Sequence, residues 1–393
     1  MTLTEPAHGM MTLPSAESAW IRDRFKEYYS THAPSPSELA RREFGFGFER
    51  KIDYRHKAFA GPGALKEFLV REGPKYVSYS TAYYDLPAAR PMENKGYRGA
   101  DLVFDLDTTY AHEPHPHQAF LCPYCLGRVK QDAQRLVEDF LVRDFGFNSS
   151  EVWVKFSGSK GYHVHVQTEA VRQLSAQARK QLLGYVTAQD VKPEAMLVKQ
   201  PLGNGRYRLQ GPTVQAQGWR GIFYRTARQF LEGCTVEKLV ERGARKAEAE
   251  RIVQAKPFVL EQMEGGNWDC LPGLRKVWPT VLEQTKSQQG LEVDQSVTFD
   301  LHRIIRLEDS LHGDTGLIAK KISGIGALEQ FDPLKDALSL DVGKTASVVP
   351  NSDITLELFN QTFELKTGKK IELPEPAVLL ILCKHKGVLT PAS

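Results

Sequence analysis

The stretch Asp101-Leu-Val-Phe-Asp105-Leu-Asp107 predicts a strand at the centre of an α/β fold. Alternate side chains of a strand share a face, so the two leucines and Phe104 point into a core, whereas the acids and Val103 point the other way. Asp105 and Asp107 lie about 6–7 Å apart along such a strand, given ~3.3 Å per residue. Both can therefore reach two cations about 3.5–4 Å apart. Because aspartates are unfavourable in strands, we interpret the pair as ligands of Mg²⁺ or Mn²⁺ rather than as solvated acids at a strand end.

A second motif, Phe-Ser-Gly-Ser-Lys-Gly-Tyr-His-Val-His-Val at residues 156–166, predicts a strand–turn–strand hairpin. Gly158 and Gly161 mark the turn, and His163 and His165 share the polar face. Backbone N–H groups, hydroxyls and a cation in this turn are suited to phosphate oxygens. These groups belong to Ser157, Ser159 and Lys160. A polar hairpin exposed to water is the alternative interpretation.

A Cys-Pro-Tyr-Cys pair lies between these two motifs. Cys122 and Cys125 have the spacing of a zinc knuckle, in which a turn brings two thiolates onto one ion. Of the histidines just upstream we choose His112 and His117 to complete the site, with His115 as an alternative. Four protein ligands make a closed, structural zinc site. A redox dithiol and a chance pair are the competing interpretations.

A third acid and two arginines occur later in the chain. Asp294 precedes a predicted helix, Arg303 and Arg306 lie off its apolar stripe, and His312 lies in the glycine-containing loop that follows. The stripe consists of Val297, Leu301, Ile304 and Ile305. The alternative is a surface helix whose arginines pair with nearby acids, and such surface charges usually contribute little.

The composition is that of a globular protein, with 41% hydrophobic and 25% charged residues. No apolar run approaches the ~18–20 residues of a membrane span, and residues 1–15 lack the order of a secretory signal. We therefore expect a cytoplasmic protein without a membrane contact. A net charge of +3 is too small to argue for nucleic acid by itself.

The chain is long enough for more than one structural unit. We expect residues 1–175 to form the first part of a catalytic core, including the zinc knuckle at 110–127. Residues 176–275 are rich in helix-forming side chains and predict a mainly helical insertion. Residues 276–393 then return to the core and add a C-terminal segment.

Basic residues outnumber acids between Arg41 and Lys57. Arg41 and Arg42 could follow a DNA backbone, with aromatic side chains nearby for stacking on bases. Alternatively, the phenylalanines at 44, 46 and 48 form an ordinary strand core.

Taken together, these motifs resemble the catalytic small subunit of archaeal and eukaryotic DNA primases, and are most similar to the archaeal form. The resemblance spans roughly residues 41–317 and rests on DLVFDLD, CPYC, SGSKGYHVHV and VDQSVTFDLHRIIRLEDSLHGDTGL in this order. It implies an α/β (α+β) fold, namely an RRM-like archaeo-eukaryotic primase core with a zinc knuckle and an inserted helical subdomain.

The resemblance also implies the roles of individual residues. It assigns the catalytic, metal-binding acids to Asp105, Asp107 and Asp294. It assigns the contacts with the nucleotide triphosphate to Ser157, Lys160, His163, Arg306 and His312. Zinc falls on Cys122, Cys125 and upstream residues. The implied cofactors are two catalytic Mg²⁺ or Mn²⁺ ions and one structural Zn²⁺.

The implied function is DNA-templated synthesis of short RNA primers, with DNA primers as a further product, by two-metal nucleotidyl transfer. The implied partners are a single-stranded DNA template, ribonucleotide and deoxyribonucleotide triphosphates, and a large primase subunit in a heterodimer. That subunit carries an iron–sulfur domain in this family. We expect no such cluster here, because the three remaining cysteines are too few and too scattered.

Two other interpretations stay open at this point. One is a primase-polymerase of plasmid or repair type, or the polymerase domain of a bacterial end-joining ligase, although the knuckle and the SLHGDTGL loop argue against the ligase-linked kind. The other is a zinc-stabilised nucleic-acid-binding module without catalysis.

Overall fold

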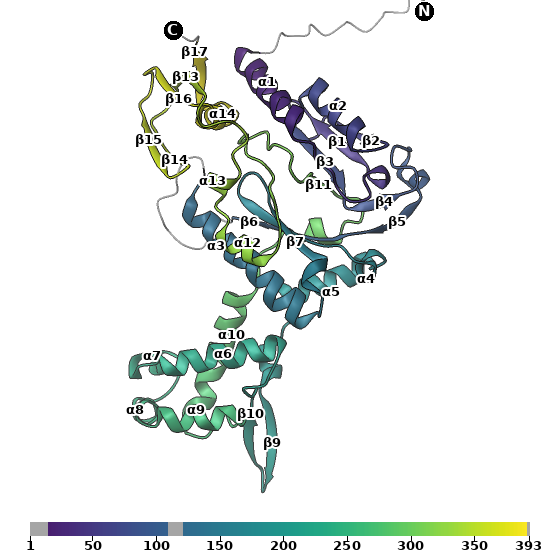
Figure 1. Cartoon of the computed structure of the whole chain (residues 1–393). Coiled ribbons are helices and arrows are strands. Elements are labelled where there is room, and N and C mark those ends of the chain that lie inside the picture. Colours follow the sequence, from purple (N-terminus) through teal and green to yellow (C-terminus); the bar gives the residue numbers. More distant parts are fainter. Residues whose placement is uncertain (1–14, 109–120, 391–393) are drawn as a thin grey trace, which may run out of the picture.

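The computed structural model describes residues 15–108 and 121–390 as a mixed α/β fold of helices and several antiparallel sheets (Figure 1). Two four-stranded sheets lie at its centre, with the strand orders β11-β3-β1-β2 and β12-β7-β8-β6. The first contains β1 (Phe44–Gly47), β2 (Tyr54–Lys57), β3 (Tyr76–Ser80) and β11 (Ile304–Arg306). The second contains β6 (Leu102–Asp107), β7 (Val152–Phe156), β8 (Gly161–Val166) and β12 (Lys321–Ile322). The predicted α/β class is confirmed.

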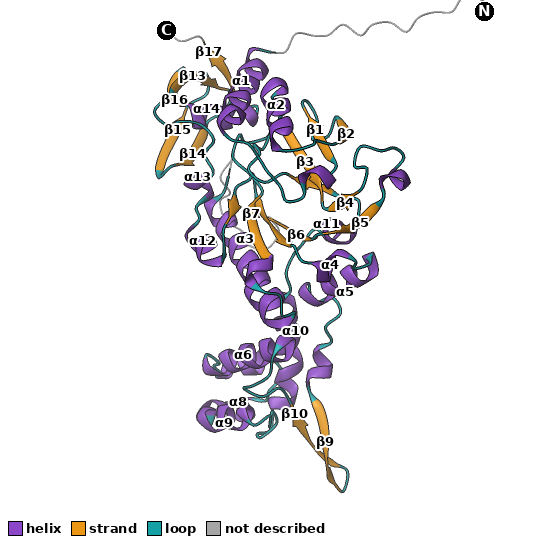
Figure 2. Ribbon diagram, turned by 45° about the vertical axis from the view of Figure 1, so that its right-hand side comes forward, coloured by secondary structure: helices purple, strands orange, loops and turns teal. Residues whose placement is uncertain are grey.

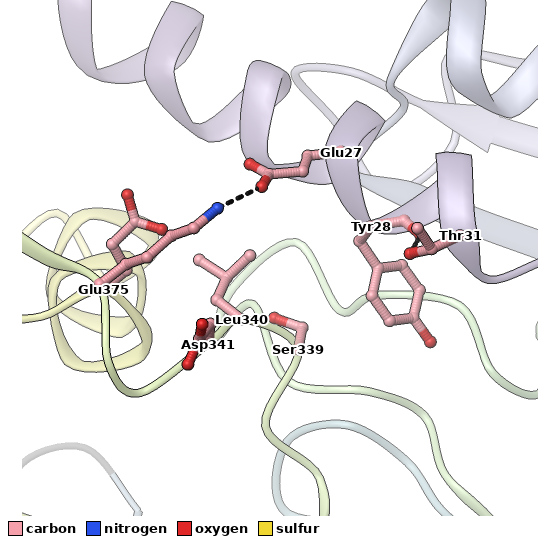
Figure 3. Close-up of a pocket in the computed structure, with 8 residues that line it drawn as sticks. Glu27, Tyr28, Thr31, Ser339, Leu340, Asp341 and Glu375 are labelled. Carbon is pink, nitrogen blue, oxygen red and sulfur yellow. Dashed lines mark hydrogen bonds and ion pairs between the residues drawn. The ribbon is translucent and has the colours of Figure 1, made fainter.

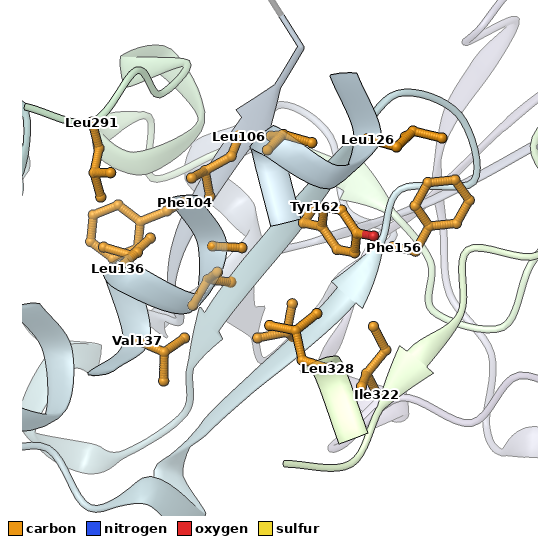
Figure 4. Packing of buried hydrophobic residues seen from close by; sticks show 14 of the residues in the cluster. Phe104, Leu106, Leu126, Leu136, Val137, Phe156, Tyr162, Leu291, Ile322 and Leu328 are labelled. Carbon is orange, nitrogen blue, oxygen red and sulfur yellow. The ribbon is translucent and has the colours of Figure 1, made fainter. Parts of the chain in front are cut away.

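The second sheet has one apolar face, which helices cover. Leu102, Phe104 and Leu106 of β6 are fully buried in the hydrophobic cluster, as predicted, although Asp101 and Val103 of the opposite face are buried as well. Helix α3 (Pro123–Arg135), the π-helical segment η3 (Leu136–Asp144) and α12 (Ile325–Gln330) supply aliphatic side chains that pack on the strand aromatics (Figure 4). The opposite face carries the acids and histidines, and it is turned toward the first sheet.

The first sheet is covered by α1 (Ala16–Thr31) and α2 (Pro62–Glu72), which pack against each other. Phe44 and Phe46 of β1 are fully buried in the same hydrophobic cluster as residues from both helices. The interpretation as strand core is therefore confirmed for Phe44 and Phe46, whereas Phe48 lies beyond the end of β1 and is partly exposed. Arg42 is also fully buried, so the hypothesis that it follows a DNA backbone is wrong.

The middle of the chain forms a mainly helical part that extends away from the two sheets (Figures 1 and 2). It begins after α5 (Ala176–Val186), which packs on α11 (Gln295–Phe299). A two-stranded hairpin, β9 (Val198–Gly203) and β10 (Arg206–Gln210), precedes the helices. These are α6 (Gly218–Glu232), α7 (Val236–Glu241), α8 (Lys246–Gln254), α9 (Lys256–Glu264) and α10 (Leu274–Gln289). Helix α10 thus runs across residue 275, where the sequence suggested that the insertion ends.

The C-terminal part combines a small sheet, a hairpin and a buried helix. The sheet contains β13 (Thr345–Pro350), β16 (Ile371–Pro374) and β17 (Gly387–Thr390), and the hairpin contains β14 (Ile354–Leu358) and β15 (Gln361–Leu365). Every residue of α14 (Glu375–Cys383) is buried, and this helix contacts α1. The shorter elements are β4 (Ala82–Tyr84), β5 (Tyr97–Ala100), α4 (Glu169–Arg172), α13 (Pro333–Asp336) and the helical turns η1 (Leu39–Arg41), η2 (Met92–Lys95), η4 (Ser149–Glu151) and η5 (Pro193–Met196).

A pocket lies between α1 and the C-terminal part (Figure 3). Its lining is Glu27, Tyr28, Thr31, Ser339, Leu340, Asp341, Lys344 and Glu375. Glu27, Lys344 and Glu375 are paired with one another or with Arg24, and Asp341 accepts from the backbone N–H of Gly343. Lys344 Nζ lies 2.8 Å from Glu27, and Arg24 Nε lies 3.2 Å from Glu375. We interpret this junction as an attachment of α1 to the C-terminal part rather than as a reaction site.

One predicted element is wrong. The helix expected across residues 297–305 ends at Phe299, and Ile304 and Ile305 belong to strand β11, which pairs with β3. β-Branched side chains favour strands. Pairing with a segment more than 200 positions away in sequence decides this structure, and helical spacing of apolar residues carries no information about such pairing.

Within residues 15–108 and 121–390, no helix is long and apolar enough to cross a membrane.

Candidate active site

The three predicted acids come together at one end of β6. Asp105 and Asp107 pair in the ladder with His163 and Gly161 of β8. The backbone N–H of Asp294 donates to the carbonyl oxygen of Asp105 at 2.9 Å, which brings in the third acid from the start of α11. A backbone bond fixes Asp294 here although nearly 190 positions separate the two residues.

The charges of these acids act on one another. Burial, together with repulsion from Asp107 and Asp294, raises the pKa of Asp105 to about 7. Its Oδ1 atom is buried and accepts no hydrogen bond, although His163 Nε2 lies 3.3 Å away. A buried, unpaired carboxylate oxygen beside two more carboxylates is an environment that a cation stabilises.

Among the described residues, no three His, Cys, Asp or Glu side chains are arranged as ready ligands of a single ion. The carboxylates of Asp107 and Asp294 lie near cationic side chains instead. Lys160 Nζ lies 3.4 Å from Asp107 Oδ2, and Arg303 Nη2 lies 3.8 Å from Asp294 Oδ2. Asp294 Oδ1 also accepts from the backbone N–H of Ser296 at 3.0 Å.

The predicted hairpin turn joins β7 to β8. Ser157 Oγ accepts hydrogen bonds from the backbone N–H groups of Ser159 at 3.4 Å and of Gly161 at 3.1 Å, which closes the turn. Gly158 has φ +85°, and a Cβ there would lie 2.7 Å from His312 Cβ. The predicted glycine-dependent hairpin is confirmed, and its turn lies directly against the loop that carries His312.

The five residues expected to contact phosphate gather from these two segments. Ser157, Lys160 and His163 come from the hairpin, whereas Arg306 and His312 come from β11 and its following loop. Thr315 Oγ1 donates to the carbonyl oxygen of Gly158 and so ties the loop to the turn.

Burial determines the protonation of the two histidines. Burial, assisted by nearby cations, lowers the pKa of His163 and of His312 well below the ordinary value, so both rings are neutral. Nδ1 of His163 is buried without a hydrogen-bond partner. The Nδ1 atom of His312 accepts from the Asp314 N–H at 3.2 Å, which leaves Nε2 as the N–H donor of the neutral ring.

Sequence reasoning missed two side chains of this site, Lys155 and Tyr76. Lys155 is fully buried, and its Nζ donates to the backbone carbonyl of Arg306, so it ties the second sheet to strand β11 of the first. The Tyr76 ring lies 5.2 Å from the Arg306 guanidinium and 6.2 Å from the His312 ring. The sequence could have indicated Lys155, because it lies on the same strand face as His163 and a buried strand face rarely carries an unpaired charge. Tyr76 offered no such signal.

The thiols of the predicted zinc knuckle are adjacent. Cys122 caps α3, Cys125 lies in its first turn, and both are buried. Burial, followed by a hydrogen bond with Cys122, raises the pKa of Cys125 to about 11. His112 and His117, together with the alternative His115, lie outside the described residues.

Comparison with known proteins identifies the class. The family model described as DNA primase small subunit matches residues 104–323. The chain is 34% identical to DNA primase small subunit PriS of Methanothrix thermoacetophila, over 95% of this chain and 98% of that protein. It is 32% identical to the PriS proteins of Natronomonas pharaonis, over 89% of this chain and 92% of that protein, and of Halobacterium salinarum, over 93% and 96%.

These matches show that the protein is a nucleotidyltransferase. The chain belongs to the family of DNA primase small subunits, whose function is catalytic. The resemblance inferred from the four motifs is thereby confirmed, including its archaeal character. Because members of this family are enzymes, the alternative hypothesis of a nucleic-acid-binding module without catalysis is wrong.

Proposed function

We propose that this chain synthesises short RNA primers on single-stranded DNA by two-metal nucleotidyl transfer, with deoxyribonucleotides as a second substrate. One observation supports the proposal most directly. Asp105, Asp107 and Asp294 come together beside the β7–β8 turn. This turn and the cationic side chains of Lys160 and Arg306 are suited to a triphosphate. The core is RRM-like, with the acids on its open face. We propose a location in the cytoplasm, where template and nucleotides meet.

The donor set fits divalent Mg²⁺ or Mn²⁺. Three carboxylates supply hard oxygen ligands, and the unpaired buried oxygen of Asp105 lies among them. In the proposal Asp105 and Asp107 would hold both ions, and Asp294 would hold one of them. When bound, the ions lower the pKa of that hydroxyl and neutralise charge on the departing pyrophosphate.

The remaining residues orient the triphosphate. Lys160 and Arg306 bring positive charge, and the neutral rings of His163 and His312 bring N–H donors. Ser157 shapes the turn that carries Lys160, because its Oγ accepts from the backbone N–H groups of Ser159 and Gly161. Because negative charge grows on the leaving pyrophosphate, these donors stabilise the transition state more than the bound nucleotide. Lys155 acts indirectly, since it fixes the backbone position of Arg306.

A structural Zn²⁺ held by Cys122, Cys125, His112 and His117 completes the proposal. Adjacent buried thiols at the start of α3 fit a tetrahedral zinc site. The ion would attach residues 110–127 to a helix that packs on the catalytic sheet.

We expect Cys122→Ser to lower the zinc content of the purified protein from about one ion per chain to none, because one lost thiolate opens a four-ligand site. The melting temperature should fall as well, since metal binding contributes to folding. Elemental analysis after dialysis and thermal unfolding measure both effects. Cys270→Ser is the control, because that cysteine is partly exposed and far from α3 in the chain. Equal zinc in both variants would exclude Cys122 as a ligand.

The relatives are named small subunits, which implies a large-subunit partner. We propose that this chain works in a heterodimer with that subunit on a DNA template.

Unprimed single-stranded DNA with labelled ribonucleotides or deoxyribonucleotides provides the test. We expect template-dependent products with Mg²⁺ or Mn²⁺, and the ratio of the two labels gives the sugar preference. Reactions with and without the large subunit separate intrinsic catalysis from dependence on the partner. Absence of product in all of these reactions would contradict the proposed function.

A further inference from the structure

The β9–β10 hairpin stands out because little of the chain that the structure describes packs on it. It is a two-stranded sheet without a third strand, and every residue of β9 is exposed. Two of these residues are large and apolar, Val198 and Leu202, with exposed fractions of 56% and 61%. Figures 1 and 2 both show the hairpin projecting from the helical part, away from the catalytic sheets.

Buried apolar contacts do not account for the stability of this hairpin. An isolated two-stranded hairpin is marginally stable in water. The C-terminal hairpin avoids this problem by burying the inward side chains of β14, including Leu356. Among the described residues, the β9–β10 hairpin is attached mainly near its base, where the backbone N–H of Trp268 donates to the Leu209 carbonyl at 3.1 Å and Gln210 bridges to Asn267. Farther along the hairpin, Arg275 donates to the Tyr207 carbonyl oxygen. A projecting strand pair that packs so little of itself suggests a role in contacting another molecule.

The charge of the hairpin is of one sign. Residues 198–210 contain Lys199, Arg206 and Arg208 and no acidic residue. The Arg208 side chain is held across the strands by Gln200, whose Oε1 accepts from Nη2 at 2.8 Å. Uniform positive charge on a narrow projection complements a phosphate backbone, because each cation can replace counterions condensed on the nucleic acid.

One face of the hairpin adds an aromatic group. The ring of Tyr207 lies 5.1 Å from Lys199 Nζ and 4.3 Å from the guanidinium of Arg275. Arg275 Nη2 also donates to the Tyr207 carbonyl oxygen at 2.7 Å, which places this cation beside the ring. Aromatic rings interleaved with cations are the arrangement by which proteins bind single strands without sequence preference.

We propose that the β9–β10 hairpin is a second contact for the single-stranded DNA template, remote from the reacting nucleotides. This inference rests on the proposed function, since it concerns the same template strand. The acids on β6 act on the nucleotide being added, whereas the hairpin holds a more distant stretch of template. A template must therefore exceed a minimum length before the hairpin contributes to binding.

The test uses the full chain with Lys199, Arg206 and Arg208 all changed to serine. Because each phosphate contact on a single strand contributes about 0.7 to the slope of log K against log salt, we expect the slope to fall in magnitude by about 2. Affinity for oligothymidine of about 60 nucleotides should fall about tenfold or more, whereas incorporation on a template of about 10 nucleotides should be unchanged. Lys199 and Arg206 are exposed and Arg208 is partly exposed, so the melting temperature should change little.

Two further variants sharpen the result. Lys366, Lys369 and Lys370 changed together to serine remove the same charge from the C-terminal part, and we expect little change in slope. Tyr207→Leu should weaken binding about fivefold or more with the slope unchanged, because stacking does not release counterions. An equal loss in both triple variants, an unchanged slope in the hairpin variant, or loss of large-subunit binding with DNA binding intact would each overturn the proposal. Binding is measured without nucleotides, so it remains interpretable even if no protein makes product.

Discussion

Asp105→Asn is expected to abolish primer synthesis, with a loss of at least about 1,000-fold, equivalent to about 4 kcal/mol of transition-state stabilisation. Asparagine keeps the shape of the side chain but lacks the charge and one of the two acceptor oxygens. In the proposed mechanism this carboxylate holds both divalent ions, so its loss affects both the attacking and the leaving oxygen. Initial rates of labelled nucleotide incorporation on unprimed single-stranded DNA measure the effect.

The structure supplies the controls for this variant. Asp105 lies beside two other carboxylates, so a neutral residue there removes repulsion and the melting temperature should not fall. Asp139→Asn makes the same chemical change on η3, where the side chain pairs with Arg143 at 3.0 Å, and we expect wild-type rates. Asp107→Asn and Asp294→Asn should each lose most activity, and the three losses should not add because the acids act as one unit. Substantial primer synthesis by folded Asp105→Asn would exclude the two-metal assignment.

The part of the site that sequence could predict is local. The alternation in Asp101–Asp107 and the glycines of the hairpin turn determine two adjacent strands, because strand period and turn geometry depend only on neighbouring residues. The pairing of Asp105 with His163 then follows from the ladder. These are the elements for which the predicted structure is confirmed.

The part that sequence could not predict depends on contacts between distant segments. Ile304–Arg306 has helical apolar spacing, yet it joins the first sheet because β3 offers it a partner. The exposed β9–β10 hairpin lies in a stretch that composition assigned to helix, since composition does not register a turn such as Gly203-Asn-Gly205. Residue roles inferred from the resemblance, including those of Arg306 and His312, stay predictions, although the structure brings these side chains to the hairpin turn.

Two adjacent arginines show most clearly that burial by distant segments cannot be predicted from local sequence. Arg41 is 48% exposed at its side chain, whereas Arg42 is fully buried, and nothing in the local sequence separates them. Arg42 Nη2 lies 2.7 Å from Asp101 Oδ2, and the guanidinium also donates to the carbonyl oxygens of Ser80 and Thr81 at 3.0 and 2.8 Å. This network joins the end of β3 to the residue that begins the carboxylate strand.

We expect Arg42→Met to lower the free energy of unfolding by about 3–5 kcal/mol, because it leaves the buried Asp101 carboxylate without its cation. Arg41→Met should change it by less than about 1 kcal/mol, because its ion pairs with Glu38 and Asp85 are exposed to solvent. Urea unfolding monitored by circular dichroism measures both. Tyr83 and Gln167 still donate to Asp101 in the Arg42 variant, at 2.6 and 3.1 Å, which keeps the loss within this range.

The double variant Arg42→Met with Asp101→Leu distinguishes the buried charge from lost packing. Removing both charges leaves no unpaired ion, so we expect the double variant to be more stable than Arg42→Met alone. Its primer synthesis should then recover together with its stability. Asp105 lies four residues beyond Asp101, which is two repeats of the pleat, and its position depends on the strand rather than on this ion pair. Equal stability of Arg42→Met and Arg41→Met would contradict the burial on which the argument rests. Recovered stability without recovered synthesis would mean that the network positions β6 for catalysis as well as holding it in the fold.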